Sequence, residues 1–163
     1  MAQRRRQRLQ VETRLVGEYL AERYPDARTF QRCRIGPLPP GLPTAGLSEA
    51  ETRTLWVWRR WVDAIAVVDH RVILIEAGLL PDLGDISKLV GYMRMFRGSP
   101  DWQEYRDWPL EGELVWAVDD PVGRRLALDA GLRVVLFHPA WVDEYLATLA
   151  ARHRRAPLPP LPD

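Results

Sequence analysis

Two apolar segments joined by a short polar turn constrain the fold of this chain more than any other feature. Residues 55–68 and 72–80 are apolar on both alternating faces, as in the runs WVDAIAVV and VILIEAGLL. Such continuous apolar runs are typical of strands buried on both sides of a sheet. The two segments therefore predict central strands that form a hairpin, with Asp69 and His70 at its turn.

Helical and strand patterns alternate on both sides of this hairpin. The expected elements are a helix over 9–24, a strand over 28–35, the hairpin, a helix from Asp85 to about 97, a strand over 114–118, a helix over 121–131, a strand over 133–137 and a helix over 140–154. A hairpin followed by strand–helix–strand alternation predicts an α/β fold with a mixed central sheet flanked by helices. The order of elements is an αβββαβ core with an extra C-terminal helix.

Composition limits the domain organisation and the compartment. The 163 residues carry 23 Lys and Arg against 22 Asp and Glu, and 47% are hydrophobic, which predicts one soluble domain over 9–155. A basic arm over 1–8 and a Pro-rich tail over 156–163 flank it. No apolar run reaches 18 residues and no secretory signal is recognisable, so we expect no membrane contact and a cytoplasmic location, or a virion-associated one for a phage protein. The absence of Asn favours a thermostable protein.

Two carboxylates stand inside the apolar hairpin, and each needs a partner there. Asp63 and Glu76 lie opposite each other if Asp69 and His70 form a two-residue turn, whereas a three-residue turn or a bulge would separate them. Opposed carboxylates repel each other unless a cation or a proton lies between them, and a hard divalent ion suits them. Alternatively, the two acids form salt bridges with arginines at the strand ends.

These residues and the order of elements over 9–138 resemble the PD-(D/E)XK nuclease superfamily, which has a restriction-endonuclease-like fold. The resemblance implies that Asp63 and Glu76 bind Mg²⁺ or Mn²⁺ together with the backbone carbonyl of Ala77. It also implies that a glutamate of the first helix, Glu18, completes the metal site. An ordinary solvated helix face explains Glu18 equally well.

The sequence departs from that family at the lysine of the motif, whose position is Gly78. Some members carry the lysine on the following helix, where Lys88, the single lysine of this chain, precedes Tyr92 with the spacing of a Gln-x-x-x-Tyr motif. Lys88 is therefore either a relocated catalytic lysine or a surface residue. Helical geometry favours the surface reading, because Lys88 points away from the apolar stripe of its helix.

Two functions follow from the resemblance. The first is a metal-dependent nuclease that hydrolyses DNA with Asp63, Glu76, Lys88 and Glu18, while Tyr92 and the N-terminal arginines contact the nucleic acid. Those arginines are Arg4, Arg5, Arg6 and Arg8. The second is an inactive nuclease-fold protein that binds DNA or serves a larger assembly such as a phage particle, with its terminal tails contacting protein partners or a second copy.

The tryptophans divide into two groups by their sequence context. Trp56, Trp58 and Trp61 lead into the apolar hairpin, so we expect them to pack in the core. Trp102 and Trp108 lie in a polar connection, where we expect them to be free to contact a partner.

Overall fold

The computed structural model describes residues 2–37, 46–48 and 59–155, and the side chains of residues 10–37, 46–48 and 59–151 among them. Trp56, Trp58, the Pro-rich tail over 156–163 and the side chains of the N-terminal arginines lie outside that description. Along the chain the elements are α1 (Ala2–Arg23), β1 (Arg28–Ile35), β2 (Arg60–Val68), β3 (Arg71–Gly78), α3 (Leu83–Phe96), a 3-10 helix η2 (Pro100–Tyr105), β4 (Leu110–Trp116), α4 (Pro121–Asp129), β5 (Arg133–Leu136) and α5 (Trp141–Arg155).

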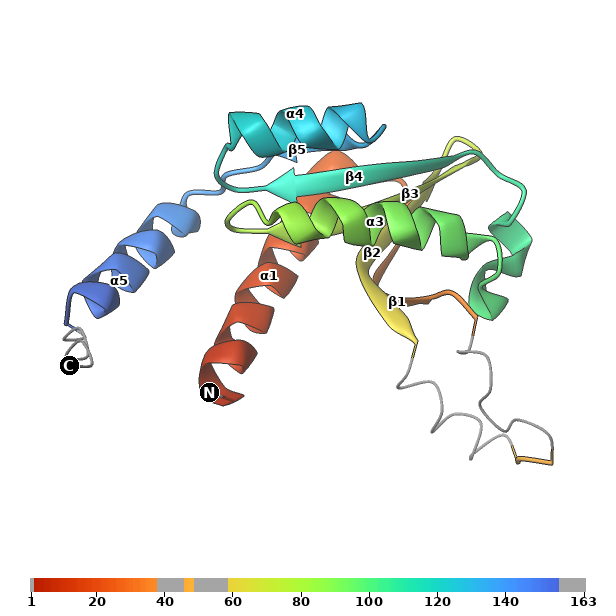
Figure 1. Cartoon of the computed structure of the whole chain (residues 1–163), viewed down its shortest axis with the longest axis horizontal. Coiled ribbons are helices and arrows are strands. Elements are labelled where there is room, and N and C mark those ends of the chain that lie inside the picture. The colour runs from red at the N-terminus through yellow and green to blue at the C-terminus, as the bar shows by residue number, and fades with distance from the viewer. Residues whose placement is uncertain (1, 38–45, 49–58, 156–163) are drawn as a thin grey trace, which may run out of the picture.

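The five strands form one mixed sheet in the order β1-β2-β3-β4-β5. The first three strands are antiparallel neighbours, while β4 pairs parallel to both β3 and β5. Helices α3 and α4 contribute to the core on one face of the sheet, and α1 and α5 contribute to the core on the other (Figure 1). The predicted α/β fold, with a mixed sheet flanked by helices, is confirmed.

The hairpin turn has the predicted length. Asp69 and His70 have φ angles of 49° and 57°, which a two-residue type I′ turn requires, and Val68 pairs with Arg71 across it. An even-numbered turn keeps the side-chain alternation of both strands in phase. The register runs from this turn to Ala64 opposite Ile75, and Asp63 and Glu76 follow directly after this last pair.

Two helices begin at residues other than those predicted. Helix α1 starts at Ala2 rather than at residue 9, so the basic N-terminal segment continues the helix. Helix α3 starts at Leu83, and its N-cap is Asp82, whose side chain accepts a hydrogen bond from the backbone N–H of Gly84. The prediction that Asp85 caps α3 was wrong because an earlier Asp satisfies the first free N–H groups. Within the described residues, none of the helices is both long enough and apolar enough to span a membrane.

The predicted locations of two tryptophans were wrong. Trp61 is 40% exposed, because its neighbour Val62 takes the core position and turns Trp61 to the opposite face of β2. Trp102 is buried, because η2 folds back so that its ring packs edge-on against Phe30 and its indole N–H donates to the carbonyl of Arg34. The polar connection after α3 therefore adds an aromatic layer to the core.

Candidate active site

The candidate site lies where the β2–β3 hairpin opens. The Asp63 carboxylate accepts a hydrogen bond of 3.0 Å from the backbone N–H of Ala77, a group that would otherwise pair with the neighbouring strand. In a regular strand, Val62 and Ala64 would face the same side of the sheet. Here Val62 packs toward α3 and Ala64 packs toward α1, so the alternation of side chains is interrupted at Asp63. On β1, Gln31 pairs with Ala64 and Cys33 pairs with Val62. Arg32 lies between these two pairs and has a φ of 53°. The local irregularity directs Asp63 toward β3.

Glu76 is the most deeply buried carboxylate of this site, with a residue exposure of 1%. Burial, together with the charge of Asp63, raises the pKa of Glu76 to about 8. Its Oε2 forms an ion pair with Lys88, but its Oε1 has no hydrogen-bond partner. A buried carboxylate oxygen without a partner is costly, so this atom is suited to an additional ligand.

Lys88 reaches the site from α3. Its ammonium forms an ion pair with Glu76 and lies 3.6 Å from the Asp85 carboxylate, while the Tyr92 ring centroid is 5.8 Å away. Burial lowers the pKa of Lys88, but the charge and hydrogen bond of Glu76 and the charges of Asp63 and Asp85 together outweigh it, so the pKa is raised overall and the ammonium keeps its proton. The side chain is 39% exposed, as a position off the apolar stripe implies, yet its long stem brings the ammonium to Glu76.

Gly78, which the resemblance places at the position of a lysine, faces the same cluster. A Cβ at Gly78 would lie 3.0 Å from the carbonyl oxygen of Leu80 and 3.9 Å from Oδ2 of Asp85. A side chain on this strand position would therefore crowd the backbone and approach the carboxylate that accompanies Lys88. The positively charged group of the site is therefore the Lys88 ammonium, which comes from α3. The sequence analysis did not identify Asp85 as its neighbour.

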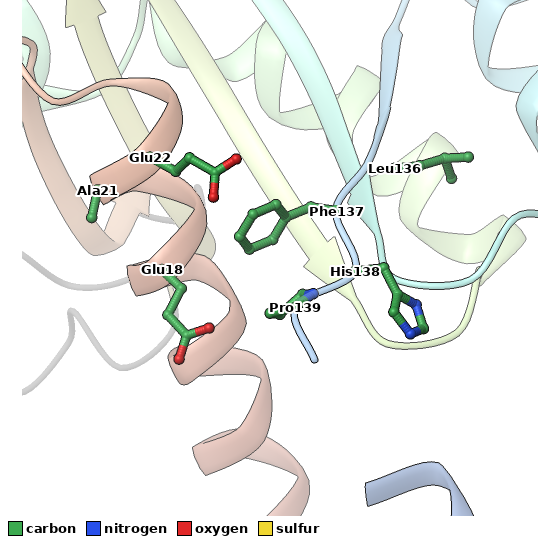
Figure 2. A pocket seen from close by; sticks show the side chains of 7 residues that line it. All are labelled: Glu18, Ala21, Glu22, Leu136, Phe137, His138 and Pro139. Atoms are coloured by element: carbon green, nitrogen blue, oxygen red, sulfur yellow. The ribbon is translucent and has the colours of Figure 1, made fainter. Parts of the chain in front are cut away.

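Glu18 lies away from this cluster. Its carboxylate accepts hydrogen bonds from the indole N–H of Trp141, at 2.7 Å, and from Nε of Arg14, at 2.8 Å, and these bonds lower its pKa. Figure 2 shows Glu18 on the side of α1 that lines an open cleft with Phe137 and His138. The structure therefore does not bring Glu18 to Asp63.

A different glutamate of α1 lies beside Asp63. Glu12 lines a small pocket together with Asp63 and Arg32, on the face of the sheet that α1 covers. Six residues separate Glu12 from Glu18, which corresponds to about 240° around a helix, so the two side chains point in different directions. The sequence of α1 offers several glutamates and does not fix the rotation of the helix on the sheet, so it does not decide which of them faces Asp63.

A second buried carboxylate provides a comparison for Glu76. Glu113 of β4 is fully buried, and it accepts hydrogen bonds from Tyr19, at 2.5 Å, and from Tyr24, and forms an ion pair with Arg133. Both oxygens of its carboxylate have partners within the protein, as is typical of a buried acid with a structural role. Glu76 differs because one oxygen is left without a partner.

The residues of the site fit a single hard cation. In the described part of the chain, no group of three or more His, Cys, Asp or Glu side chains is arranged to hold a metal ion. Two carboxylates are present, however, and the unpartnered Oε1 of Glu76 supplies one acceptor. The N–H of Ala77 points toward Asp63, and the carbonyl of the same strand residue points to the same side of the strand. Water would complete the coordination of Mg²⁺ at such a site.

Comparison with known proteins yields one solved structure and no family. No protein-family model matches the chain, and no curated protein matches it. The chain is similar to a repair endonuclease from Pyrococcus abyssi at 16% sequence identity and a TM-score of 0.46. The alignment covers 76% of this chain and 46% of the endonuclease, so this chain matches less than half of that protein's length.

Proposed function

We propose that this chain is a PD-(D/E)XK-type nuclease that hydrolyses DNA phosphodiesters with a divalent metal ion. The observation that carries the proposal is Glu76, a buried carboxylate with an unpartnered oxygen, close enough to Asp63 to be affected by its charge and in contact with the single lysine of the chain. The order of elements and the motif positions, other than Gly78, resemble that superfamily and support the same function.

The proposed roles follow from the position of each side chain. Asp63 and Glu76, with the carbonyl of Ala77, would hold Mg²⁺ or Mn²⁺. The bound ion would supply Lewis-acid polarisation of the scissile phosphate and a water of lowered pKa. Lys88 would stabilise the negative charge that develops on the phosphate, since its ammonium keeps its proton and is already at the carboxylates. Asp85 would hold that ammonium in place.

A second function is favoured by Gly78. A chain that lacks the strand lysine can retain the fold without catalysis. The ion pair between Lys88 and Glu76 would then compensate the buried acid in place of a metal ion. Such a protein would bind DNA or serve as a component of a larger assembly. The two functions differ in whether Mg²⁺ or Mn²⁺ binds between Asp63 and Glu76.

The test is cleavage of labelled single-stranded and double-stranded DNA by the full chain with Mg²⁺, Mn²⁺ or EDTA. We expect cleavage only with a metal ion, and loss of cleavage in Asp63→Asn and Glu76→Gln, because each change removes a charged ligand. Lys88→Arg keeps the charge but replaces a compact ammonium by a broad guanidinium, so we expect a rate loss of at least ~10²-fold.

Glu104→Gln is the matched control, because Glu104 is 61% exposed and lies outside the cluster. Its cleavage rate should equal that of the unmodified chain. If the unmodified chain cleaves neither substrate with either metal and binds no Mn²⁺, the inactive alternative is correct and the nuclease proposal is wrong.

A further inference from the structure

We propose that Trp61, Arg32 and Arg34 form a stacking platform that binds an unpaired base of single-stranded DNA next to the candidate active site. The inference rests on the proposed function, because it assigns the substrate class of that site as single-stranded DNA. The three residues lie on β1 and β2, at the irregularity where Asp63 leaves the regular strand.

Trp61 is exposed, unlike the tryptophans that pack in the core. The residue is 40% exposed, whereas Trp102 and Trp116 are buried in the core. An indole gains free energy by covering its faces, so an exposed one on a strand is available to an external planar group. Nucleic-acid bases are such groups, and stacking on an aromatic side chain is a general way of binding single strands.

Two guanidinium groups accompany the ring. The Arg34 guanidinium carbon lies 5.0 Å from the Trp61 ring centroid, and that of Arg32 lies 6.0 Å from it. Arg34 is the direct cross-strand partner of Trp61 in the register of β1 and β2. Guanidinium planes stack on aromatic faces, and the exposed Arg32 can also bind a phosphate with two parallel hydrogen bonds, so the platform combines base stacking with backbone binding.

The backbone at Arg32 supports a functional origin for this arrangement. A φ of 53° is the left-handed region, which costs an ordinary residue roughly 1 kcal/mol relative to glycine and is held only by its surroundings. Arg32 also lines the small pocket that contains Asp63, so the strained residue connects the platform to the site. In the described part of the chain, no salt bridge joins Arg32 to a carboxylate.

A second tryptophan–arginine pair shows what a structural pair looks like in this chain. The Arg14 guanidinium lies 4.4 Å from the Trp141 ring centroid, and Glu18 accepts hydrogen bonds from both side chains. The acid neutralises that arginine and repels phosphate. Trp141 is therefore the matched control for Trp61.

The geometry favours an unpaired base over a duplex. Bases inside a duplex are covered by their neighbours on both faces, so an exposed ring on a strand can stack only on a base that is unpaired, flipped or at a frayed end. The platform would hold such a base while the adjoining phosphate approaches Asp63.

The test is fluorescence polarisation of a labelled 12-nucleotide thymidine strand, an abasic strand of the same length, a 12-base-pair duplex and a 12-nucleotide uridine RNA, all in EDTA. The full chain should bind the thymidine strand about tenfold more tightly than the abasic strand, since only the former offers bases. Trp61→Leu should remove that difference, while Trp61→Phe should retain most of it. Replacing both arginines by glutamine should weaken binding to both strands and reduce the salt dependence.

Trp141→Leu and Arg125→Gln are the controls, because Trp141 is paired internally and Arg125 is 78% exposed on α4 with its own partner Asp129. Both variants should keep the preference for the thymidine strand. Equal affinity for the thymidine and abasic strands, an unchanged preference in Trp61→Leu, or tighter binding of duplex or RNA would overturn the proposal. The binding assay contains EDTA and no metal ion, so a negative binding result does not decide the cleavage test. Absence of cleavage likewise does not decide the binding result.

Discussion

Glu76→Gln should stabilise the protein at neutral pH, although it removes one partner of an ion pair. Burial and the charge of Asp63 raise the pKa of Glu76 from its usual 4.5 to about 8. The folded chain therefore holds a proton that the unfolded chain releases between these two values, and stability falls as the pH rises through this window. At pH 7 the loss corresponds to about 3 kcal/mol at 1.36 kcal/mol for each pKa unit.

The glutamine keeps the shape of the side chain and has no proton to release on unfolding. Lys88 loses its partner, but it is 39% exposed and retains Asp85 at 3.6 Å, so this loss is about 1 kcal/mol. We therefore expect Glu76→Gln to gain about 1–2 kcal/mol at pH 7. The gain should disappear near pH 5, where the folded unmodified chain and the variant are both neutral at this position.

Urea unfolding in EDTA at pH 5, 6.5 and 8 measures this difference, with Glu104→Gln as the exposed control, which should change stability by less than about 0.5 kcal/mol. The reasoning would be refuted if Glu76→Gln destabilised the protein at pH 8, or if its effect did not change with pH. In that case Glu76 would be a structural partner of Lys88, like Glu113 with Arg133.

Three further predictions concern the scaffold, and urea unfolding at pH 7 measures each. Tyr19→Phe should cost about 1–3 kcal/mol, because it removes the 2.5 Å hydrogen bond to the buried Glu113; no change would show that this acid is satisfied by its other partners. Asp120→Ala should cost about 1 kcal/mol, because it removes the cap that accepts from the N–H of Val122; a neutral result would contradict that role. His70→Gly should gain up to about 1 kcal/mol by relieving a φ of 57° at the hairpin turn, and a loss would mean that the His70–Trp108 ring contact matters more.

The sequence predicted the fold through local patterns that the structure keeps. The apolar runs of β2 and β3 identify the centre of the sheet because they are buried on both faces. The two-residue turn fixes the phase of both strands, so the register from Val68 opposite Arg71 to Ala64 opposite Ile75 follows from counting alone. Pro121 after Asp120 likewise marked the start of α4.

The parts that the sequence did not predict depend on how elements rotate against one another. Glu12 and Glu18 are equally plausible on a helical wheel, and only the packing of α1 against the sheet places Glu12 beside Asp63. The ion pair of Lys88 depends on the reach of a flexible side chain from α3, which residue spacing does not specify. Trp61 resembled a core residue because its neighbours are apolar, but Val62 takes the buried position.

The most direct test of the proposed metal site is anomalous diffraction from crystals of the full chain soaked in Mn²⁺. We predict one strong peak within coordination distance of the Asp63 and Glu76 carboxylates and the carbonyl of Ala77, with the Lys88 ammonium displaced from direct contact with Glu76 and still beside Asp85. A peak in the cleft beside Glu18, or no peak between Asp63 and Glu76 at saturating Mn²⁺, would contradict the proposed metal site.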